Sequence, residues 1–253
     1  MKTVLITGAT SGIGKATATT FASNGYRLIL TGRRQTQLSS LAGTLKRKYN
    51  TESLCLCFDI SDYGQSKNAC RKLKGKWDKI DVLINNAGLA LGLADIIDGK
   101  LEDWEQMIDT NIKGLLYITK MIIPFMVKAV SGHIVNIGSI AGRDTYPQGN
   151  VYCATKFAVK SLSQALRMEL IQYNIKVTEI VPGAVKTEFS LVRFKGDKKK
   201  ADRVYDGYEP LKPKEVADII HYVTTLPPNV NINELTVTSL AQANPFVLLR
   251  NKK

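Results

Sequence analysis

A tyrosine and a lysine lie four residues apart in the segment NVYCATKFAV, residues 150–159. On a helix this spacing places Tyr152 and Lys156 on the same face, one turn apart. A phenol can donate a proton to a reacting oxygen, but its ordinary pKa is about 10. A nearby ammonium group stabilises the phenolate, whereas burial opposes ionisation. The spacing leaves two interpretations open: a proton-transfer pair, or an ordinary amphipathic helix.

Two further polar residues lie where a reacting group could be held. Ser139 follows the apolar run GHIVNIG and precedes Tyr152 by 13 residues. If that run is a strand of a parallel sheet, Ser139 lies at the carboxyl edge, where such sheets bind ligands. Its hydroxyl can then hold a substrate oxygen beside Tyr152. Asn111 lies within a long helical pattern although asparagine is a weak helix former, so it has either a role in the site or a buried capping or hydrogen-bonding role.

The elements that must position these residues alternate regularly along the chain. Short β-branched runs separated by helical patterns predict βαβ units and a parallel sheet. The strands are apolar on both faces, which indicates helices on both sides. The fold class expected is therefore α/β, a doubly wound sheet of about seven strands forming one domain over residues 1–253. The expected strands are 3–8, 27–32, 53–60, 80–88, 132–139, 175–183 and 233–239, and the expected helices are 14–25, 35–49, 61–77, 102–128, 150–173 and 213–226.

A glycine-rich turn follows the first expected strand, in VLITGATSGIGKA. Gly8 allows a tight turn, Gly12 lets the backbone approach a pyrophosphate, and Gly14 lets the helix pack close to the strand. The free N–H groups of the helix N-terminus then face the phosphates. Glycine patterns alone are weak signals, but here the strand–turn–helix context that such a motif requires is present.

Three motifs occur in order at expected strand ends: the Gly-x3-Gly-x-Gly turn, NNAG at residues 85–88 and the Tyr-x3-Lys pair. In this respect the chain resembles the short-chain dehydrogenase/reductase family over nearly its whole length. The resemblance implies a Rossmann fold, a nicotinamide dinucleotide, and catalysis by Asn111, Ser139, Tyr152 and Lys156, in which Asn111 supports a water on the lysine. It also implies cofactor contacts from Gly8, Thr10, Ser11, Gly12, Ile13, Gly14, Arg33, Arg34, Asp59, Ile60, Asn86, Ala87, Gly88, Asn111, Tyr152, Lys156, Pro182, Gly183, Val185 and Thr187. No metal is implied.

The end of the second expected strand indicates which dinucleotide is bound. NAD-binding folds place an acidic residue there to accept from the ribose 2′-hydroxyl. Here Gly32 occupies that position, and Arg33 and Arg34 follow. Guanidinium groups bind a 2′-phosphate well, so the sequence predicts NADP(H). Alternatively, one or both arginines are solvated residues at a helix start.

A closer resemblance is carried by NNAGLALG, DWEQMIDTNIKGLLYITK, TEFSLVRFKGD and NVNINELTV. These segments look like those of NADP-dependent 3-hydroxy acid dehydrogenases. The resemblance implies hydride transfer at C3 of serine, L-allo-threonine or 3-hydroxypropionate (malonic semialdehyde when oxidised), in a homotetramer. The alternatives are another short-chain reductase, acting on 3-oxoacyl carrier protein, steroid or xenobiotic ketones, and a non-catalytic NADP-binding sensor.

A small hydroxy acid needs a cation to bind its carboxylate. The expected substrate lid, around residues 186–210, carries Lys186, Arg193 and Lys195, and Arg143 follows the fifth expected strand. Arg193 is favoured because a guanidinium binds a carboxylate with two parallel hydrogen bonds. With Ser139 and Tyr152 it forms the predicted substrate site.

Composition limits the partners. The net charge of +13 includes basic runs at 46–48 and 195–200, which nucleic acids or anionic membranes could bind, but few aromatic residues interleave with them. Solvated loops are the preferred interpretation, with neither nucleic acid nor membrane as partner. Four cysteines lack metal-site spacing, and Cys55 and Cys57 are expected on one buried strand face. No signal peptide or membrane span is expected, so a cytoplasmic location is predicted.

Overall fold

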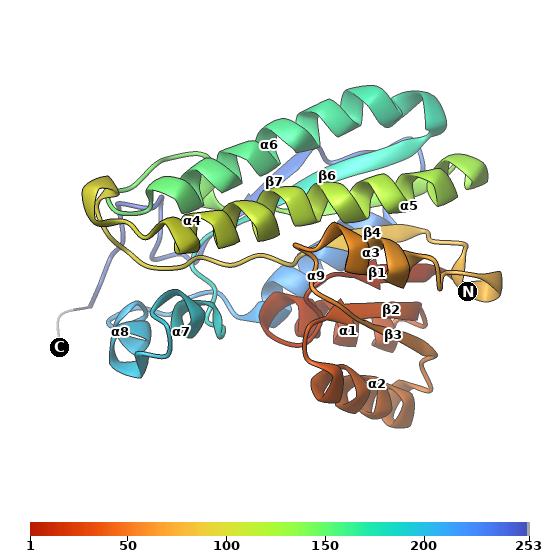
Figure 1. Ribbon diagram of the computed structural model, residues 1–253, viewed down its shortest axis with the longest axis horizontal. Helices are drawn as coiled ribbons and strands as arrows, with labels where there is room; N and C mark the ends of the chain where they lie inside the picture. Colours follow the sequence, from red (N-terminus) through yellow and green to blue (C-terminus); the bar gives the residue numbers. More distant parts are fainter. Residues whose placement is uncertain (252–253) are drawn as a thin grey trace.

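A seven-stranded, wholly parallel sheet forms the centre of the computed structural model, which describes residues 1–251 (Figure 1). The strand order is β3-β2-β1-β4-β5-β6-β7, which confirms the predicted doubly wound α/β class. The strands are β1 (Thr3–Ile6), β2 (Arg27–Gly32), β3 (Ser53–Cys57), β4 (Val82–Asn85), β5 (Gly132–Ile137), β6 (Ile175–Pro182) and β7 (Glu234–Val237).

Helices cover both faces of this sheet (Figure 1). One face packs on α1 (Gly12–Ser23), α2 (Gln35–Tyr49) and α9 (Pro213–Thr225), with Phe21 and Ile220 fully buried between them and the strands. The other packs on α3 (Tyr63–Cys70), α5 (Leu115–Ala129) and α6 (Asn150–Leu170), with Ile118 and Leu166 in the second apolar core. The remaining elements are α4 (Leu101–Ile108), α7 (Phe189–Arg193), α8 (Lys198–Arg203) and the short helices η1 (Gly75–Trp77), η2 (Ile96–Asp98), η3 (Asp109–Gly114), η4 (Ile140–Gly142) and η5 (Ile171–Tyr173).

The order of the strands creates one crevice. From β1 the chain proceeds outward through β2 to β3, then returns to place β4 on the other side of β1. The connections after β1 and β4 therefore diverge onto opposite faces, which leaves a gap beyond the carboxyl ends of these strands. The glycine-rich turn and the NNAG segment both lie at this gap.

Two of the expected helices differ from the structure. The helix expected over 102–128 is interrupted by η3, a π-helical segment that joins α4 to α5. The helix expected over 61–77 ends at Cys70, and Gly75 has a left-handed backbone (φ +60°) that starts a separate short turn. Both differences arise from backbone hydrogen bonding, which the side-chain pattern does not specify.

The cysteines also correct one expectation. Cys57 is exposed and Cys55 is only partly buried, because β3 is the edge strand of the sheet. Cys70 and Cys153 are buried, and all four thiols are free. Within residues 1–251, no group of His, Cys, Asp and Glu side chains is arranged to hold a metal ion.

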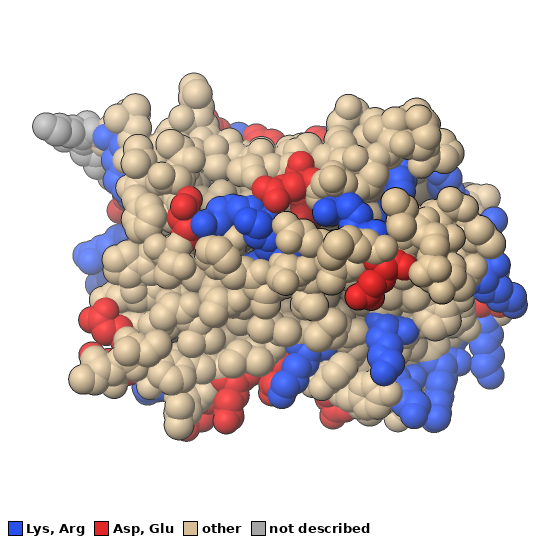
Figure 2. Space-filling model, turned by 90° about the horizontal axis from the view of Figure 1, so that it is seen from above, with Lys and Arg blue, Asp and Glu red and all other residues tan. Residues whose placement is uncertain are grey.

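The surface charges are dispersed. Figure 2 shows Lys and Arg side chains in separate groups, with acidic residues between some of them. In the basic run at 195–200, three lysines pair with carboxylates: Lys195 with Asp103, Lys198 with Asp202 and Lys200 with Asp197. Across the described part of the chain, no helix combines the length and apolar character needed to cross a bilayer.

Candidate active site

A single elongated cavity of about 580 Å³ lies beyond the carboxyl ends of the strands. It runs from the end of β2 to the first turn of α6, and the segment 187–193 closes one side. Every residue predicted to touch the cofactor lines it except Gly14 and Asn111, and the predicted substrate residues Ser139 and Arg193 line it too. The structure thus brings the sequence motifs together in one place.

The glycine turn shows why three glycines are needed. Gly8 and Gly12 have left-handed backbones, with φ of +65° and +51°, which disfavour any side chain. A Cβ on Gly14 would lie 2.3 Å from the carbonyl oxygen of Gly8. Gly14 therefore serves the close packing of α1 against the turn, as predicted, and is separated from the cavity by that turn.

The two asparagines of the NNAG segment have different roles. Asn86 Nδ2 donates to the carbonyl oxygens of Thr7 (2.8 Å) and Gly8 (3.3 Å), which fixes the glycine turn from the side of β4. Asn85 is buried and donates to the side chains of Thr119 and Asn136, both at 2.9 Å. One asparagine shapes the cavity, and the other ties β4 to β5 and α5.

Two arginines lie at the far end of the cavity. Arg33 forms an ion pair of 3.4 Å with Asp59 and keeps 57% of its side chain exposed. Arg34 donates to Thr10 Oγ1 at 2.9 Å and pairs with Glu188 at 3.2 Å. Burial raises the pKa of Asp59, but hydrogen bonds from Ser61 and the charge of Arg33 outweigh it and hold that pKa below its usual value. Both guanidinium groups therefore border a site where an added anion would meet positive charge.

The other end of the cavity holds the Tyr–Lys pair on α6. Lys156 is buried, and its ammonium group donates to the carbonyl oxygen of Ile137 at 2.8 Å. Burial lowers the pKa of Lys156 to about 8, although the negative charge of Glu179 opposes this shift. Ser139 caps η4 by accepting a hydrogen bond from the N–H of Ala141 (3.1 Å), so its own proton stays available for donation.

The pKa of Tyr152 corrects a prediction. Burial raises this pKa above its ordinary value, reinforced by Tyr146, while the charge of Arg193 and a hydrogen bond with Ser139 oppose the rise. Lys156 was expected to supply the lowering charge. Instead its ammonium lies 5.9 Å from the centre of the Tyr152 ring and is bound to Ile137. Burial therefore holds the phenol of Tyr152 in its neutral, protonated form.

Arg193 lies over the aromatic ring of Tyr152. Its guanidinium carbon lies 4.9 Å from the centre of the Tyr152 ring and 5.4 Å from that of Phe189. Its Nη2 donates to the hydroxyl of Tyr146 at 2.7 Å, whereas its buried Nε has no partner within residues 1–251.

The other basic candidates are placed differently. Arg143 is bound to the carboxylates of Glu179 and Glu234, both at 2.7 Å. Lys195 pairs with Asp103 at 2.8 Å, and Lys186 is exposed outside the main cavity. Of the four candidates, Arg193 alone lines the cavity.

Asn111 lies one layer behind the cavity wall. Its Oδ1 accepts from the N–H of Leu89 (2.9 Å), and its Nδ2 donates to the carbonyl of Leu89 (2.8 Å) and to Thr155 Oγ1 (3.0 Å). The π-helical turn η3 carries it, which explains a weak helix former inside a long helical pattern. Gly88 lies between Asn111 and Lys156, since a Cβ there would lie 3.3 Å from Asn111 Oδ1 and 3.7 Å from Lys156 Nζ.

Several lining residues were not predicted. Tyr146 and Phe189 flank Arg193, and the cavity is completed by Tyr205, Tyr208 and a C-terminal segment that includes Gln242 and Arg250. Gln242 accepts from the N–H of Ala184 at 2.8 Å. The aromatic residues of the expected lid could have been recognised from the sequence. The C-terminal segment could not, because no local motif identifies it and it reaches the cavity only when the chain is folded.

Comparison with known proteins agrees with this geometry. The chain is 44% identical over 241 residues to the NADP-dependent 3-hydroxy acid dehydrogenase of Salmonella typhi, covering 95% of this chain and 96% of that protein. The enzyme of the same description from Schizosaccharomyces pombe is 45% identical, covering 93% and 92%. The closed form of a serine dehydrogenase complexed with NADP+ superposes with a TM-score of 0.92 at 41% identity, covering 99% of this chain and all of that one.

The model of the family described as short chain dehydrogenase matches residues 2–197. That span contains the glycine turn, the NNAG segment, Ser139 and the Tyr–Lys pair. Because the match covers most of the chain and the relatives align along nearly all of it, the chain belongs to the short-chain dehydrogenase family.

Proposed function

We propose that this protein is an NADP-dependent oxidoreductase that transfers a hydride between NADP and C3 of a small 3-hydroxy acid. The observation that carries the substrate class is the position of Arg193, whose guanidinium stacks on the reacting Tyr152 and borders the same cavity as Ser139. A small acid whose hydroxyl lies between Ser139 and Tyr152 would have its carboxylate within reach of the Arg193 guanidinium. The named relatives support the same class.

The cavity fits an extended dinucleotide. The left-handed glycine turn leaves the backbone of Gly8 and Gly12 bare, as a pyrophosphate requires. Arg33 and Arg34 would hold the 2′-phosphate, Asp59 and Ile60 the adenine side, and Lys156 the nicotinamide ribose. Asn86, Ala87, Gly88 and the segment 182–187 would contact the rest. When bound, the nicotinamide supplies the hydride or accepts it.

The chain itself positions the substrate and moves the proton. Ser139 donates a hydrogen bond to the substrate oxygen and holds it against the hydroxyl of Tyr152. In reduction Tyr152 gives its proton to that oxygen, and in oxidation it takes one. The charge of Arg193 favours the phenolate that results, against the effect of burial. Asn111 holds the Leu89 segment and supports a water-mediated path to Lys156.

We further propose that residues 1–253 form one functional unit, that 186–210 act as a substrate lid, and that the protein is a cytoplasmic homotetramer. Support for assembly comes from exposed apolar side chains on the sheet-covering helices, among them Leu116 on α5 and Phe157 and Met168 on α6. Light scattering coupled to size exclusion should give a mass four times that of the chain. A monomeric mass at micromolar concentration would refute the tetramer.

The reaction class is tested by following NADPH absorbance with purified protein. L-serine, L-allo-threonine and 3-hydroxypropionate are the acids, and acetoacetyl thioesters and neutral ketones represent the other reductases of the family. Turnover with at least one acid and NADP+ is expected. Tyr152→Phe should abolish turnover while NADPH binding, measured by fluorescence, is retained. Turnover confined to ketones would instead assign the protein to a carbonyl reductase of another substrate class.

The substrate anchor is tested by Arg193→Ala. Removing charged hydrogen bonds of this kind costs about 1.5–3 kcal/mol, so KM for the acid should rise roughly 10- to 100-fold. KM for NADP+ should change by less than about 2-fold, because Arg193 is not among the proposed cofactor contacts. A change of this size is smaller than the loss of one charged hydrogen bond would cause. The methyl ester of the same acid should show no comparable rise. Lys186→Ala is the matched control; an effect there and none at residue 193 would move the anchor to Lys186.

A further inference from the structure

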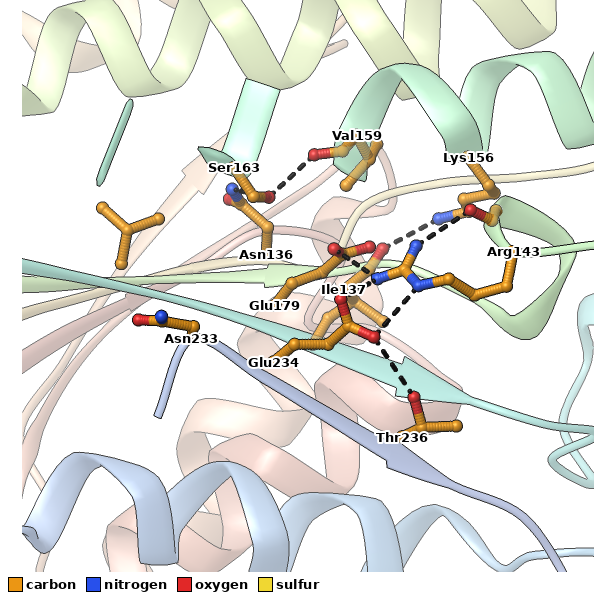
Figure 3. Close-up of polar contacts among 12 residues, drawn as sticks. Asn136, Ile137, Arg143, Lys156, Val159, Ser163, Glu179, Asn233, Glu234 and Thr236 are labelled. Atoms are coloured by element: carbon orange, nitrogen blue, oxygen red, sulfur yellow. Dashed lines mark hydrogen bonds and ion pairs between the residues drawn. The ribbon is translucent and has the colours of Figure 1, made fainter. Parts of the chain in front are cut away.

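Figure 3 shows a group of charged side chains in which Arg143 lies beside Glu179 and Glu234. None of these three residues lines the cavity of the candidate active site. Arg143 follows η4, Glu179 projects from β6, and Glu234 projects from β7. Arg143 Nη2 lies 2.7 Å from a carboxylate oxygen of each glutamate, and its Nε donates to Glu234 Oε1 at 3.0 Å. One guanidinium thus joins the turn after β5 to two neighbouring strands.

Burial makes any unpaired charge in this group of side chains unfavourable. The side chain of Glu179 is 2% exposed and that of Arg143 is 16% exposed, whereas Glu234 reaches solvent. An ionised carboxylate at such depth is strongly unfavourable unless it is paired. The two glutamates balance the charges of Arg143 and Lys156, so the loss of any one of these four residues leaves the group with an uncompensated charge.

The backbone is closely packed around the side chain of Glu179. A Cβ on Gly138 would lie 2.1 Å from Glu179 Oε1, and a Cβ on Gly142 would lie 2.6 Å from the carbonyl oxygen of Lys156. The turn that starts at Ser139 therefore fits between the glutamate on one side and α6 on the other. A shift of Arg143 would move both ends of this turn.

The turn carries residues that face the reaction. Ser139 lies four residues before Arg143, and Tyr146, which binds Arg193, lies three residues after it. The carbonyl of Ile137, two residues before Ser139, accepts from Lys156. Arg143 is the one residue in this stretch that is fixed to strands β6 and β7 through its side chain.

We propose that Arg143, held by Glu179 and Glu234, is a positioning residue of the reaction that fixes Ser139 against Tyr152 and Lys156. This role rests on the proposed oxidoreductase function, because it acts through Ser139. Arg143 lies outside the cavity and touches neither substrate nor cofactor. Glu179 is the essential carboxylate, since it is buried and faces Lys156, and Glu234 is the auxiliary one.

The first test is a comparison of Arg143→Met, Arg143→Lys and Glu234→Gln. A displacement of about 1 Å at a reacting group can cost roughly 100-fold in rate, so Arg143→Met should lower kcat by about 10- to 100-fold. NADPH binding should stay within about 2-fold of the parent, because no cofactor contact is removed. Arg143→Lys keeps the charge but cannot bridge two carboxylates and should recover only part of kcat. Glu234→Gln should lower kcat by less than about 3-fold, as expected when an exposed partner is lost.

Arg143→Met leaves Glu179 buried without a partner and can fail to fold. The double variant Arg143→Met/Glu179→Gln removes both buried charges, which is usually tolerated. If it folds with a normal melting temperature and its kcat stays well below that of Glu179→Gln alone, Arg143 has the positioning role. A folded double variant with parental kcat would overturn the proposal and leave only a structural ion pair.

A pH profile separates positioning from simple stability. Lys156 is faced by Glu179 on β6 and by Tyr152 on its own helix. Besides Lys156, the groups that face Tyr152 are Tyr146, Arg193, Ser139 and, on its own helix, Cys153. Glu179→Gln removes the negative charge, so both apparent pKa values of the coupled Tyr–Lys pair should fall, by about one unit at an effective dielectric near 20. An unshifted profile would show that Glu179 does not act on the pair.

The outcomes also distinguish this proposal from the proposed function. If Tyr152→Phe remains active, the proposed oxidoreductase mechanism fails, and the positioning role of Arg143, which acts through Ser139 and Tyr152, fails with it. If Tyr152→Phe is inactive while Arg143→Met is fully active, only the positioning role is refuted.

Discussion

At the scale of single residues, the main difference from the expected site is which cation acts on the pKa of Tyr152. Lys156 is one turn from Tyr152, but its ammonium is bound to a carbonyl and burial lowers its own pKa to about 8. Arg193, from a segment outside the sheet, stacks on the ring and opposes the rise in the pKa of Tyr152. The guanidinium that we propose as the anchor of the substrate carboxylate is therefore also the one that acts on the pKa of Tyr152.

A residue-level prediction concerns the choice of dinucleotide. Arg33→Ala should raise KM for NADP+ roughly 10- to 100-fold, the value of a lost charged hydrogen bond, and leave KM for NAD+ nearly unchanged. Initial-rate kinetics with both dinucleotides provide the measurement. Arg34→Ala should act more weakly, because Arg34 is already bound to Thr10 and Glu188. Equal losses with both dinucleotides would mean that Arg33 does not contact a 2′-phosphate.

At the scale of elements, the strands were predicted well because each is a short, largely apolar run between turn signals. The helix carrying Asn111 was predicted as continuous, since a π-helical turn changes backbone hydrogen bonds without altering the side-chain periodicity that sequence reveals. The proposed pair of Tyr152 and Lys156 could be found in the sequence because its four-residue spacing is local. The contacts of Arg143 could not, because Glu179 and Glu234 are 36 and 91 residues away in sequence.

Strand β5 supports a prediction about acid stability. His133 Nε2 lies 2.8 Å from Thr178 Oγ1 inside the sheet. Burial, followed by the charge of Lys176, lowers the pKa of His133 to about 3. The unfolded chain therefore binds a proton that the folded chain does not, between about pH 6.5 and 3, and stability is lost as pH falls through that window.

Because the unfolded chain takes up this proton, His133 alone should lower the free energy of unfolding by about 2–3 kcal/mol when the pH falls from 7 to 4.5. Urea unfolding at both pH values measures the loss for the parent and for His133→Gln, whose side chain can still bond to Thr178. On the same acidification, the free energy of unfolding of the variant should fall by about 2–3 kcal/mol less than that of the parent. His221→Gln is the control, because this ring is only partly buried between Phe21 and Tyr26 and should change the pH dependence less. Identical acid losses in the parent and the His133 variant would contradict the assignment.

At the scale of the whole molecule, distant parts of the chain close the cavity together. The sheet supplies its floor, and the segment 187–208 supplies one wall. The C-terminal segment secures that wall from behind: Arg250 donates to the carbonyl oxygens of Val204 (3.3 Å) and Asp206, and Asn251 donates to that of Gly207 at 2.7 Å. The shape of this cavity wall therefore depends on the last described residues as well as on the segment 187–208.

Arg250→Ala tests this coupling between the C-terminal segment and the lid. The guanidinium stacks on Tyr208, which lines the cavity, and its loss should loosen the wall and raise KM for both substrates by about 3- to 10-fold, the value of one or two ordinary hydrogen bonds. The melting temperature should change little, because these contacts lie at the surface and outside both apolar cores. Arg203→Ala, an exposed arginine on α8 away from the cavity lining, is the matched control. If both variants keep the parental KM values, the C-terminal segment packs against the lid without controlling it.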